Sequence, residues 1–156
     1  MKRIRFFALG GLGENGKNMY AVEVENEIFI LDAGLKYPTN ELYGVDEIIP
    51  DYKMLVRAKR RIVGIFISHA HEDHVGALPY MLKDLEVPVF GTPLALAFIK
   101  DSLVESGYDL NDYTFVTVNP DQTLPFNNAN VTFFNTTHSI PESVGIAIET
   151  EEGSVV

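Results

Sequence analysis

The chain has 156 residues, of which 46% are hydrophobic and 22% are charged, and this length and apolar content suit one globular domain. It contains no cysteine, which excludes disulfides and thiolate metal sites and favours a reducing compartment. The formal net charge of -10 argues against a protein that coats nucleic acid with a surplus of lysine and arginine, but it does not exclude a nuclease, because bound divalent cations would supply positive charge at the site itself.

The first part of the chain predicts antiparallel strands. Residues 4–9 form a short apolar strand that ends in a glycine-rich loop at residues 10–16, and the alternating stretch 19–30 contains a turn typical of a hairpin. The apolar run near the amino terminus is too short for a signal peptide, and no segment has the length of a membrane span. We therefore expect a soluble, cytoplasmic protein without a membrane association.

The rest of the chain predicts strands that alternate with helices, followed by further strands. Helices are expected at residues 52–59, 76–85 and 93–106, and strands at residues 62–68, 87–90, 114–118, 131–135 and 143–149, with a turn-rich stretch at 119–130. One apolar face of the third helix is expected to consist of Leu94, Ala97, Phe98, Ile99 and Leu103. A last strand begins at Ser154 and stops after two valines, which predicts a truncated chain because natural domains rarely end inside an apolar strand.

Three of the four histidines lie in the segment His69-Ala70-His71-Glu72-Asp73-His74, between a predicted buried strand and a helix. Imidazole and carboxylate groups are the ligands that suit zinc and similar divalent ions. His69 and His71, two apart in an extended segment, project to the same side and can bind one ion. Asp73 and His74 are adjacent, so that their side chains are expected to diverge and to serve a second ion. The alternative is a polar surface loop in which Asp73 caps the following helix.

The fourth histidine, His138, follows the predicted strand 131–135. A lone histidine between threonine and serine is more often an ordinary loop residue than a ligand. A first site built from His69 and His71 needs a third protein ligand, however, and no other histidine is left to supply it. We therefore expect His138 to complete that site.

Two other features are ambiguous. Residues 11–16 match the G-x-G-x-x-G pattern of dinucleotide-binding loops, with Asp32 downstream, but an alternating strand follows where that pattern requires a helix, which favours a tight turn near the rim of the active site. A cluster of five basic residues favours a solvated helix face, with contact to an RNA backbone as the alternative. The cluster consists of Lys53, Arg57, Lys59, Arg60 and Arg61.

The H-x-H-x-D-H pattern resembles the signature of the metallo-β-lactamase superfamily, and several further segments together resemble the RNase J family of its β-CASP group. These segments are Ala8-Leu9-Gly10-Gly11-Leu12-Gly13-Glu14, Gly16-Lys17-Asn18-Met19-Tyr20, Leu31-Asp32-Ala33-Gly34, Ile49-Pro50-Asp51-Tyr52 and Thr136-Thr137-His138-Ser139-Ile140-Pro141. The resemblance implies an α/β metallo-β-lactamase fold, an αββα sandwich. Residues 1–156 would form a single, incomplete domain that ends before the second half and the β-CASP insertion.

The resemblance also implies roles for individual residues. His69, His71 and His138 would bind the first of two divalent ions, either Zn²⁺ or Mn²⁺, and Asp73 and His74 would bind the second and take part directly in catalysis. A bridging aspartate and a further histidine would lie beyond residue 156. Asp32 matches a position that supports the metal loop from outside the ligand set, although an aspartate in a turn before glycine explains the local sequence equally well.

By resemblance, the function is two-metal hydrolysis of RNA phosphodiester bonds in RNA maturation and decay, including rRNA processing. The enzyme would act as a 5′-3′ exonuclease on 5′-monophosphorylated RNA, would also cut internally, and would form a homo-oligomer or a hetero-oligomer with a paralogue. Residues 1–156 alone are expected to be inactive. Two alternatives remain open at this stage: a lactone or thioester hydrolase of the same fold, and a non-catalytic paralogue subunit of an RNase J assembly.

Overall fold

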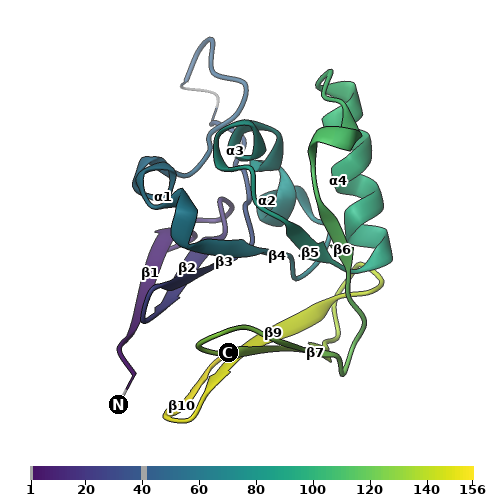
Figure 1. Cartoon of the computed structure of the whole chain (residues 1–156). Coiled ribbons are helices and arrows are strands. Elements are labelled where there is room, and N and C mark those ends of the chain that lie inside the picture. Colours follow the sequence, from purple (N-terminus) through teal and green to yellow (C-terminus); the bar gives the residue numbers. More distant parts are fainter. Residues whose placement is uncertain (1, 40–41) are drawn as a thin grey trace.

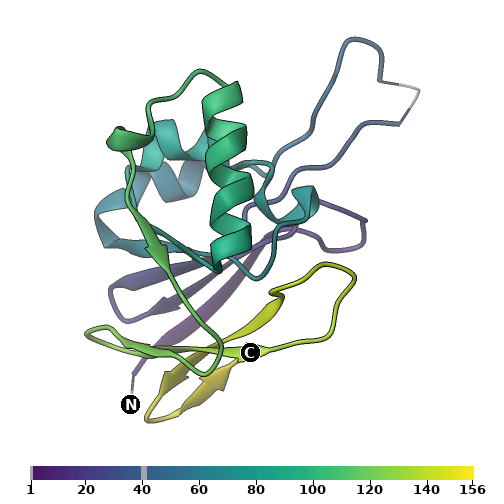
Figure 2. The ribbon, with the colours of Figure 1, turned by 90° about the vertical axis from the view of Figure 1, so that its right-hand side faces the viewer.

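The computed structural model describes residues 2–39 and 42–156, except for the side chain of Arg60. A layer of helices covers one face of a six-stranded sheet, and a four-stranded sheet packs against the other face (Figure 1). The chain on both sides of residues 40–41 extends away from these layers (Figure 2). Lys36 and Ile48 pair at the base of this extension.

The six-stranded sheet begins with antiparallel strands and continues with parallel ones. Its strands follow one another in chain order: β1 (Ile4–Gly10), β2 (Met19–Val24), β3 (Glu27–Leu31), β4 (Ile62–Phe66), β5 (Val89–Gly91) and β6 (Phe115–Thr117). β1, β2 and β3 pair antiparallel, which confirms the expected hairpin, and β3 to β6 pair parallel. Because β3 and β4 are parallel, the loops that follow them leave the same edge of the sheet.

Along the chain, the helices alternate with the parallel strands, and their positions are close to those expected. They are α1 (Lys53–Arg57), α2 (Glu72–Val75), α3 (Leu78–Leu85) and α4 (Pro93–Glu105), with the 3-10 helices η1 (Lys59–Arg61) and η2 (Leu110–Asp112). The helix expected at 76–85 is α3, and Pro79 occupies its first turn as predicted. In residues 2–39 and 42–156, none of these helices combines the length and hydropathy needed to cross a bilayer.

The expected apolar face of α4 is partly wrong. Ala97 and Phe98 are exposed, and the buried side chains are those of Ala95, Leu96, Ile99 and Leu103. The helix is apolar around most of its circumference, so that two overlapping stripes satisfy the helical period. Packing of α4 against β5 and β6 selects one of them.

The four-stranded sheet is antiparallel, with the order β10-β9-β8-β7. Its strands are β7 (Thr123–Pro125), β8 (Asn130–Asn135), β9 (Val144–Thr150) and β10 (Gly153–Val155). β7 lies inside the stretch 119–130, which was expected to be rich in turns and for which no strand was predicted. A three-residue strand is too short to show an alternating pattern, and it ends in Pro125, a residue tolerated in a sheet mainly at an edge.

Two apolar cores separate the three layers. Alternate residues of the central strands point to opposite faces, so that Ile28 and Ile30 pack under the helices while Phe29 points toward the second sheet. The core between the sheets is rich in phenylalanine, with Phe66 and Phe90 stacked at a ring-centroid distance of 4.6 Å. This core holds the two sheets together, and it brings the loop after β8 to the end of β4.

Candidate metal centre

Residues 68–74, here called the histidine loop, connect the end of β4 to α2. Four backbone hydrogen bonds tie this loop to other segments. The Val144 amide donates to the Ser68 carbonyl oxygen at 2.9 Å, which links the loop to the start of β9. Segments near β2 and β3 provide the other three bonds: Asn18 N to Asp73 O at 2.9 Å, Ala33 N to His74 O at 2.7 Å and Leu35 N to Glu72 O at 3.0 Å. Both sheets therefore position the loop.

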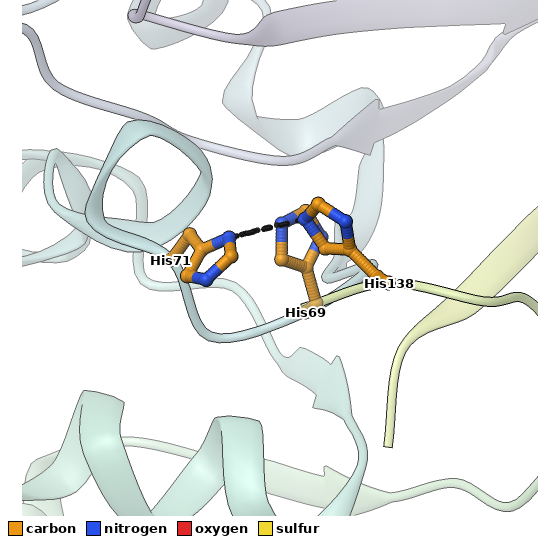
Figure 3. Close-up of side chains that lie close together, drawn as sticks. All are labelled: His69, His71 and His138. Carbon is orange, nitrogen blue, oxygen red and sulfur yellow. Dashed lines mark hydrogen bonds between the residues drawn. The ribbon is translucent and has the colours of Figure 1, made fainter. Parts of the chain in front are cut away.

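Three imidazole rings converge at this edge, two from the histidine loop and one from the loop after β8 (Figure 3). Nε2 of His69 and Nε2 of His138 each lie 3.1 Å from Nδ1 of His71. One ligand nitrogen from each of the three residues lies within 4.8 Å of the other two, and no other such group of three or more His, Asp or Glu side chains occurs among the residues that the structure describes. The expectation that His138 approaches His69 and His71 is confirmed, and the three rings could hold a metal ion.

The protonation state of His69 suits metal binding. Its side chain is only 6% exposed, and burial, together with the positive charge of His74, lowers its pKa to about 4. At neutral pH the ring is therefore uncharged, the form in which imidazole binds a metal ion. Nδ1 of His69 lies 2.9 Å from the Ser68 hydroxyl, which leaves Nε2 facing His71.

Asp73 and His74 lie beside these three rings, and their side chains do not diverge as expected. The distance from His74 Nε2 to Asp73 Oδ2 is 3.6 Å, and the ring centroids of His69 and His74 are 4.1 Å apart. The prediction assumed an extended backbone, but α2 begins at Glu72, so that neighbouring side chains are separated by about 100° rather than 180°. The side-chain amide of Asn18 also donates to Asp73 Oδ2 at 3.0 Å and lies 3.2 Å from His74 Nε2, which holds both groups on one side.

Asp32 follows β3 and connects Ser68, at the start of the histidine loop, to His74 at its end. One carboxylate oxygen accepts from the Ser68 amide at 2.8 Å, and the other accepts from the Ser68 hydroxyl at 2.8 Å and lies 2.7 Å from His74 Nδ1. Burial of the His74 ring lowers its pKa, but the hydrogen bond and negative charge of Asp32, with the charge of Asp73, outweigh burial and raise the pKa above 6.5. Asp32 has a φ of 58°, so that it also occupies a turn, and the two sequence interpretations are compatible.

Sequence reasoning assigned no role to Asn18, Ser68 or Gly34. A Cβ atom on Gly34 would lie 1.6 Å from the Asp73 carbonyl oxygen, so that only glycine allows the histidine loop to approach this closely. Asn18 contacts a residue 55 positions away, and Asp32 contacts one 42 positions away. Asn18 and Gly34 do fall in the segments that carry the family resemblance, and that was the only available signal, because a local pattern cannot reveal contacts over such separations.

The glycine-rich loop forms a tight turn beside the histidine loop. β2 follows it, so that the helix required by a dinucleotide-binding loop is absent at this point. Gly16 has a φ of 96°, and the Lys17 amide donates to the Leu35 carbonyl oxygen at 2.9 Å. Gly16 lines the same groove as His71 and Asp73, as expected for a rim position.

The basic cluster near α1 is partly structural. Arg61 pairs with Glu23, a buried carboxylate that also pairs with Arg5, and Lys59 pairs with Glu86 at 3.8 Å. The side chain of Arg60 lies outside the described part. The ion pair of Arg61 with a buried partner differs from the solvated face that was expected.

Comparison with known proteins agrees with this architecture. Residues 12–156 match the family model described as the metallo-beta-lactamase superfamily. The chain is similar to Ribonuclease J 2 from Staphylococcus epidermidis, with 46% identity over 99% of this chain and 28% of that protein. It is also similar to Ribonuclease J 1 from Streptococcus pyogenes, with 47% identity over 96% of this chain and 27% of that protein. The chain thus spans less than a third of the length of these relatives.

A solved structure has a similar fold. The metallo-beta-lactamase fold protein YhfI from Bacillus subtilis matches with a TM-score of 0.66 and 15% identity, over 97% of this chain and 60% of that one. At this identity the match concerns the fold alone. It confirms the fold class that the sequence predicted.

Proposed function

The chain belongs to the metallo-beta-lactamase superfamily, and on that premise we propose that it carries the metal centre of a metal-dependent ribonuclease. The convergence of His69, His71 and His138 supports this proposal, in a chain that is 46% identical to a ribonuclease J. We further propose a cytoplasmic enzyme that degrades 5′-monophosphorylated RNA from its 5′ end, also cuts internally, and assembles with itself or with a paralogue. Residues 1–156 would form one structural unit of that enzyme.

The residues of the centre would bind two ions. His69, His71 and His138 would bind the first ion, and Asp73 and His74 would contribute to the second. Bound divalent cations supply Lewis-acid polarisation of a phosphodiester and neutralise the negative charge that develops on it. Asp32 would fix the orientation of His74 through Nδ1, which leaves Nε2 directed toward Asp73. Three imidazoles suit Zn²⁺, and a mixed set of imidazole and carboxylate also accepts Mn²⁺.

Residues 1–156 by themselves are expected to hydrolyse RNA very slowly or not at all. In the described part of the chain, the residues assigned to the second ion are Asp73 and His74, which lie beside the three imidazoles. Two protein ligands hold a divalent ion weakly compared with the three or four of stable zinc sites. Rapid metal-dependent turnover by the purified 156-residue chain would contradict this expectation.

The test uses the protein expressed from its complete gene. Metal content and hydrolysis of a 5′-monophosphorylated RNA are measured for the wild type, for Asp73→Ala and for Asp101→Ala, a control that removes an exposed aspartate of α4. We expect metal-dependent release of mononucleotides by the wild type and the control, and a loss of at least 100-fold in Asp73→Ala, comparable to the loss of a major transition-state contact.

Two outcomes would overturn the proposal. Turnover of a lactone or thioester without RNA hydrolysis would assign a small-molecule hydrolase. Unchanged RNA decay by an assembly in which only this subunit carries Asp73→Ala would assign a non-catalytic subunit.

A further inference from the structure

A groove of about 700 Å³ opens beside His71, one of the three imidazoles. The glycine-rich loop forms one wall with Gly16, the segment after β3 supplies Lys36 and Tyr37, and the histidine loop supplies the third wall with His71 and Asp73. Its size lies within the roughly 300 to 1,000 Å³ of small-molecule sites. A ligand in this groove, here called the Tyr37 groove, would contact two of the residues proposed to bind the ions.

Tyr37 presents a fixed aromatic ring in this groove. Its side chain is 56% exposed, and its hydroxyl donates a hydrogen bond to Glu72, the residue between His71 and Asp73. This hydrogen bond attaches the phenolic end of the ring to the histidine loop. The position of the ring relative to the metal centre is therefore set by the same loop that carries the ligands.

The charged residues that line the Tyr37 groove are Lys36, Glu72 and Asp73. Nζ of Lys36 lies 3.3 Å and Nζ of Lys17 lies 3.1 Å from the Glu14 carboxylate, so that two ammonium groups share one carboxylate. A second cavity of about 490 Å³ also has Glu72 in its lining. Glu47, Glu72 and Glu105 line it, with no lysine or arginine among its described lining residues. With divalent ions bound at the histidine loop, the first cavity would combine their charge with that of Lys36, whereas the charged lining residues of the second are all carboxylates. A polyanion would therefore be attracted to the first cavity and repelled by the second.

We propose that the Tyr37 groove binds a nucleotide of single-stranded RNA next to the bond that is cleaved, with the Tyr37 ring stacked on its base and Lys36 paired with its phosphate. This inference rests on the proposed ribonuclease function. Stacking on an aromatic ring is available to every base, so that the contact secures the strand without selecting its sequence. Tyr37 would position the substrate and take no part in proton transfer.

The test compares Tyr37→Leu and Tyr37→Phe with Tyr43→Leu, a control on the same extension whose side chain is 93% exposed and does not line the groove. Each variant is made in the protein expressed from its complete gene, and metal content is measured first. Steady-state hydrolysis is then followed on single-stranded RNA and on matched RNAs that carry one abasic nucleotide, placed in turn at each position around the cleaved bond.

Loss of the ring is expected to raise KM for RNA on the order of tenfold, with kcat and metal content unchanged, because a stacked base is bound equally in the ground and transition states. Tyr37→Phe should raise KM less than Tyr37→Leu does, because it keeps the ring for stacking but loses the hydrogen bond to Glu72 that positions the ring. Tyr43→Leu should not change KM. When the abasic nucleotide occupies the position that would stack on Tyr37, the wild type and Tyr37→Leu should have the same KM.

Each contrary result is distinguishable from failure of the ribonuclease proposal. RNA hydrolysis by the wild type with an unchanged KM in Tyr37→Leu would overturn the stacking inference alone. The same conclusion follows if Tyr37→Phe is as defective as Tyr37→Leu, or if the defect persists at every abasic position. A wild type that binds metal but does not hydrolyse RNA would overturn both proposals.

Discussion

The three imidazoles and the Asp73–His74 pair lie side by side but are assembled in different ways. The imidazoles of His71 and His138 come from loops 67 residues apart, one from each sheet. Asp73 and His74 come from a single turn of helix, and residues near β2 and β3 hold them: Asn18 contacts both side chains and Asp32 contacts the His74 ring. The first group therefore depends on how the two sheets pack, whereas the second depends on contacts with the first sheet alone.

The pKa values show the same contrast. Burial holds His69 uncharged, with its pKa lowered to about 4, whereas the contacts of Asp32 raise the pKa of His74 despite burial. One histidine is ready to bind a cation without releasing a proton, and the other is stabilised by a negative partner. Changes at the two groups should accordingly have separable effects, which four experiments can test.

The largest effect is expected for His138→Ala. This change removes the one imidazole that comes from the second sheet, so that the first site keeps only His69 and His71. Loss of a residue that only hydrogen-bonds to a metal ligand lowers metal affinity roughly 10- to 100-fold. Zinc affinity should fall by more than this, because His138 is a proposed ligand itself. Competition with a chelator of known affinity measures the change. His138→Asp, which restores a ligand atom, should recover part of the affinity, and an unchanged affinity in His138→Ala would separate this residue from the metal site.

Asp32→Asn should have the next largest effect, and it acts on the other group. Asparagine tolerates the positive φ of this position and can still accept from the Ser68 amide, but it removes the negative charge next to His74. We expect affinity for the second ion to fall roughly 10- to 100-fold while the first ion is bound almost normally. Calorimetric titration that resolves two binding steps would show this. Equal losses in both steps would mean that the two groups are not independent.

Gly34→Ala tests whether close backbone packing holds the histidine loop. The added Cβ would lie 1.6 Å from the Asp73 carbonyl oxygen, so that one of the two segments must move. Overpacking of this kind typically lowers the free energy of unfolding by about 1–3 kcal/mol. Gly13→Ala is the matched control. Its added Cβ would meet no atom within 4 Å, so that alanine would be unfavourable there only because of the φ of 68°. Urea denaturation compares the two variants, and equal stabilities would argue against the packing explanation.

The smallest effect is expected in a pH titration of the unmutated protein. In the metal-free protein, imidazole resonances should titrate near pH 4 for His69 and above pH 6.5 for His74. The unfolded chain binds a proton at position 69 more readily than the folded one, so that this residue makes the fold less stable as pH falls from 6.5 to 4. The contribution of His74 is complete below pH 6.5 and is lost as pH rises through its raised folded-state pKa. Two histidines with the same pKa would contradict the contrast.

Much of the fold was predictable because it depends on local patterns. The alternation in 19–30 gave the hairpin, and the apolar run before His69 gave the buried strand that carries the histidine loop. The strand β7 was not predicted because its pattern is too short, and the apolar face of α4 was partly wrong because two solutions satisfy the pattern. They were also wrong for Asp73 and His74, because the transition from extended backbone to helix falls at Glu72, within the motif itself.

By itself the sequence determined which chemical groups are available: four imidazoles and one aspartate, three of the rings in one short segment, with no cysteine to replace them. Only the tertiary structure decided how they are grouped. His138 reaches His71 because a phenylalanine-rich core joins the sheets, and His74 is held by Asp32 because β3 and β4 are parallel and end at the same edge. The physical reason is that both contacts depend on sheet pairing and packing between segments far apart in the chain, and periodicity and spacing record only what neighbouring residues do.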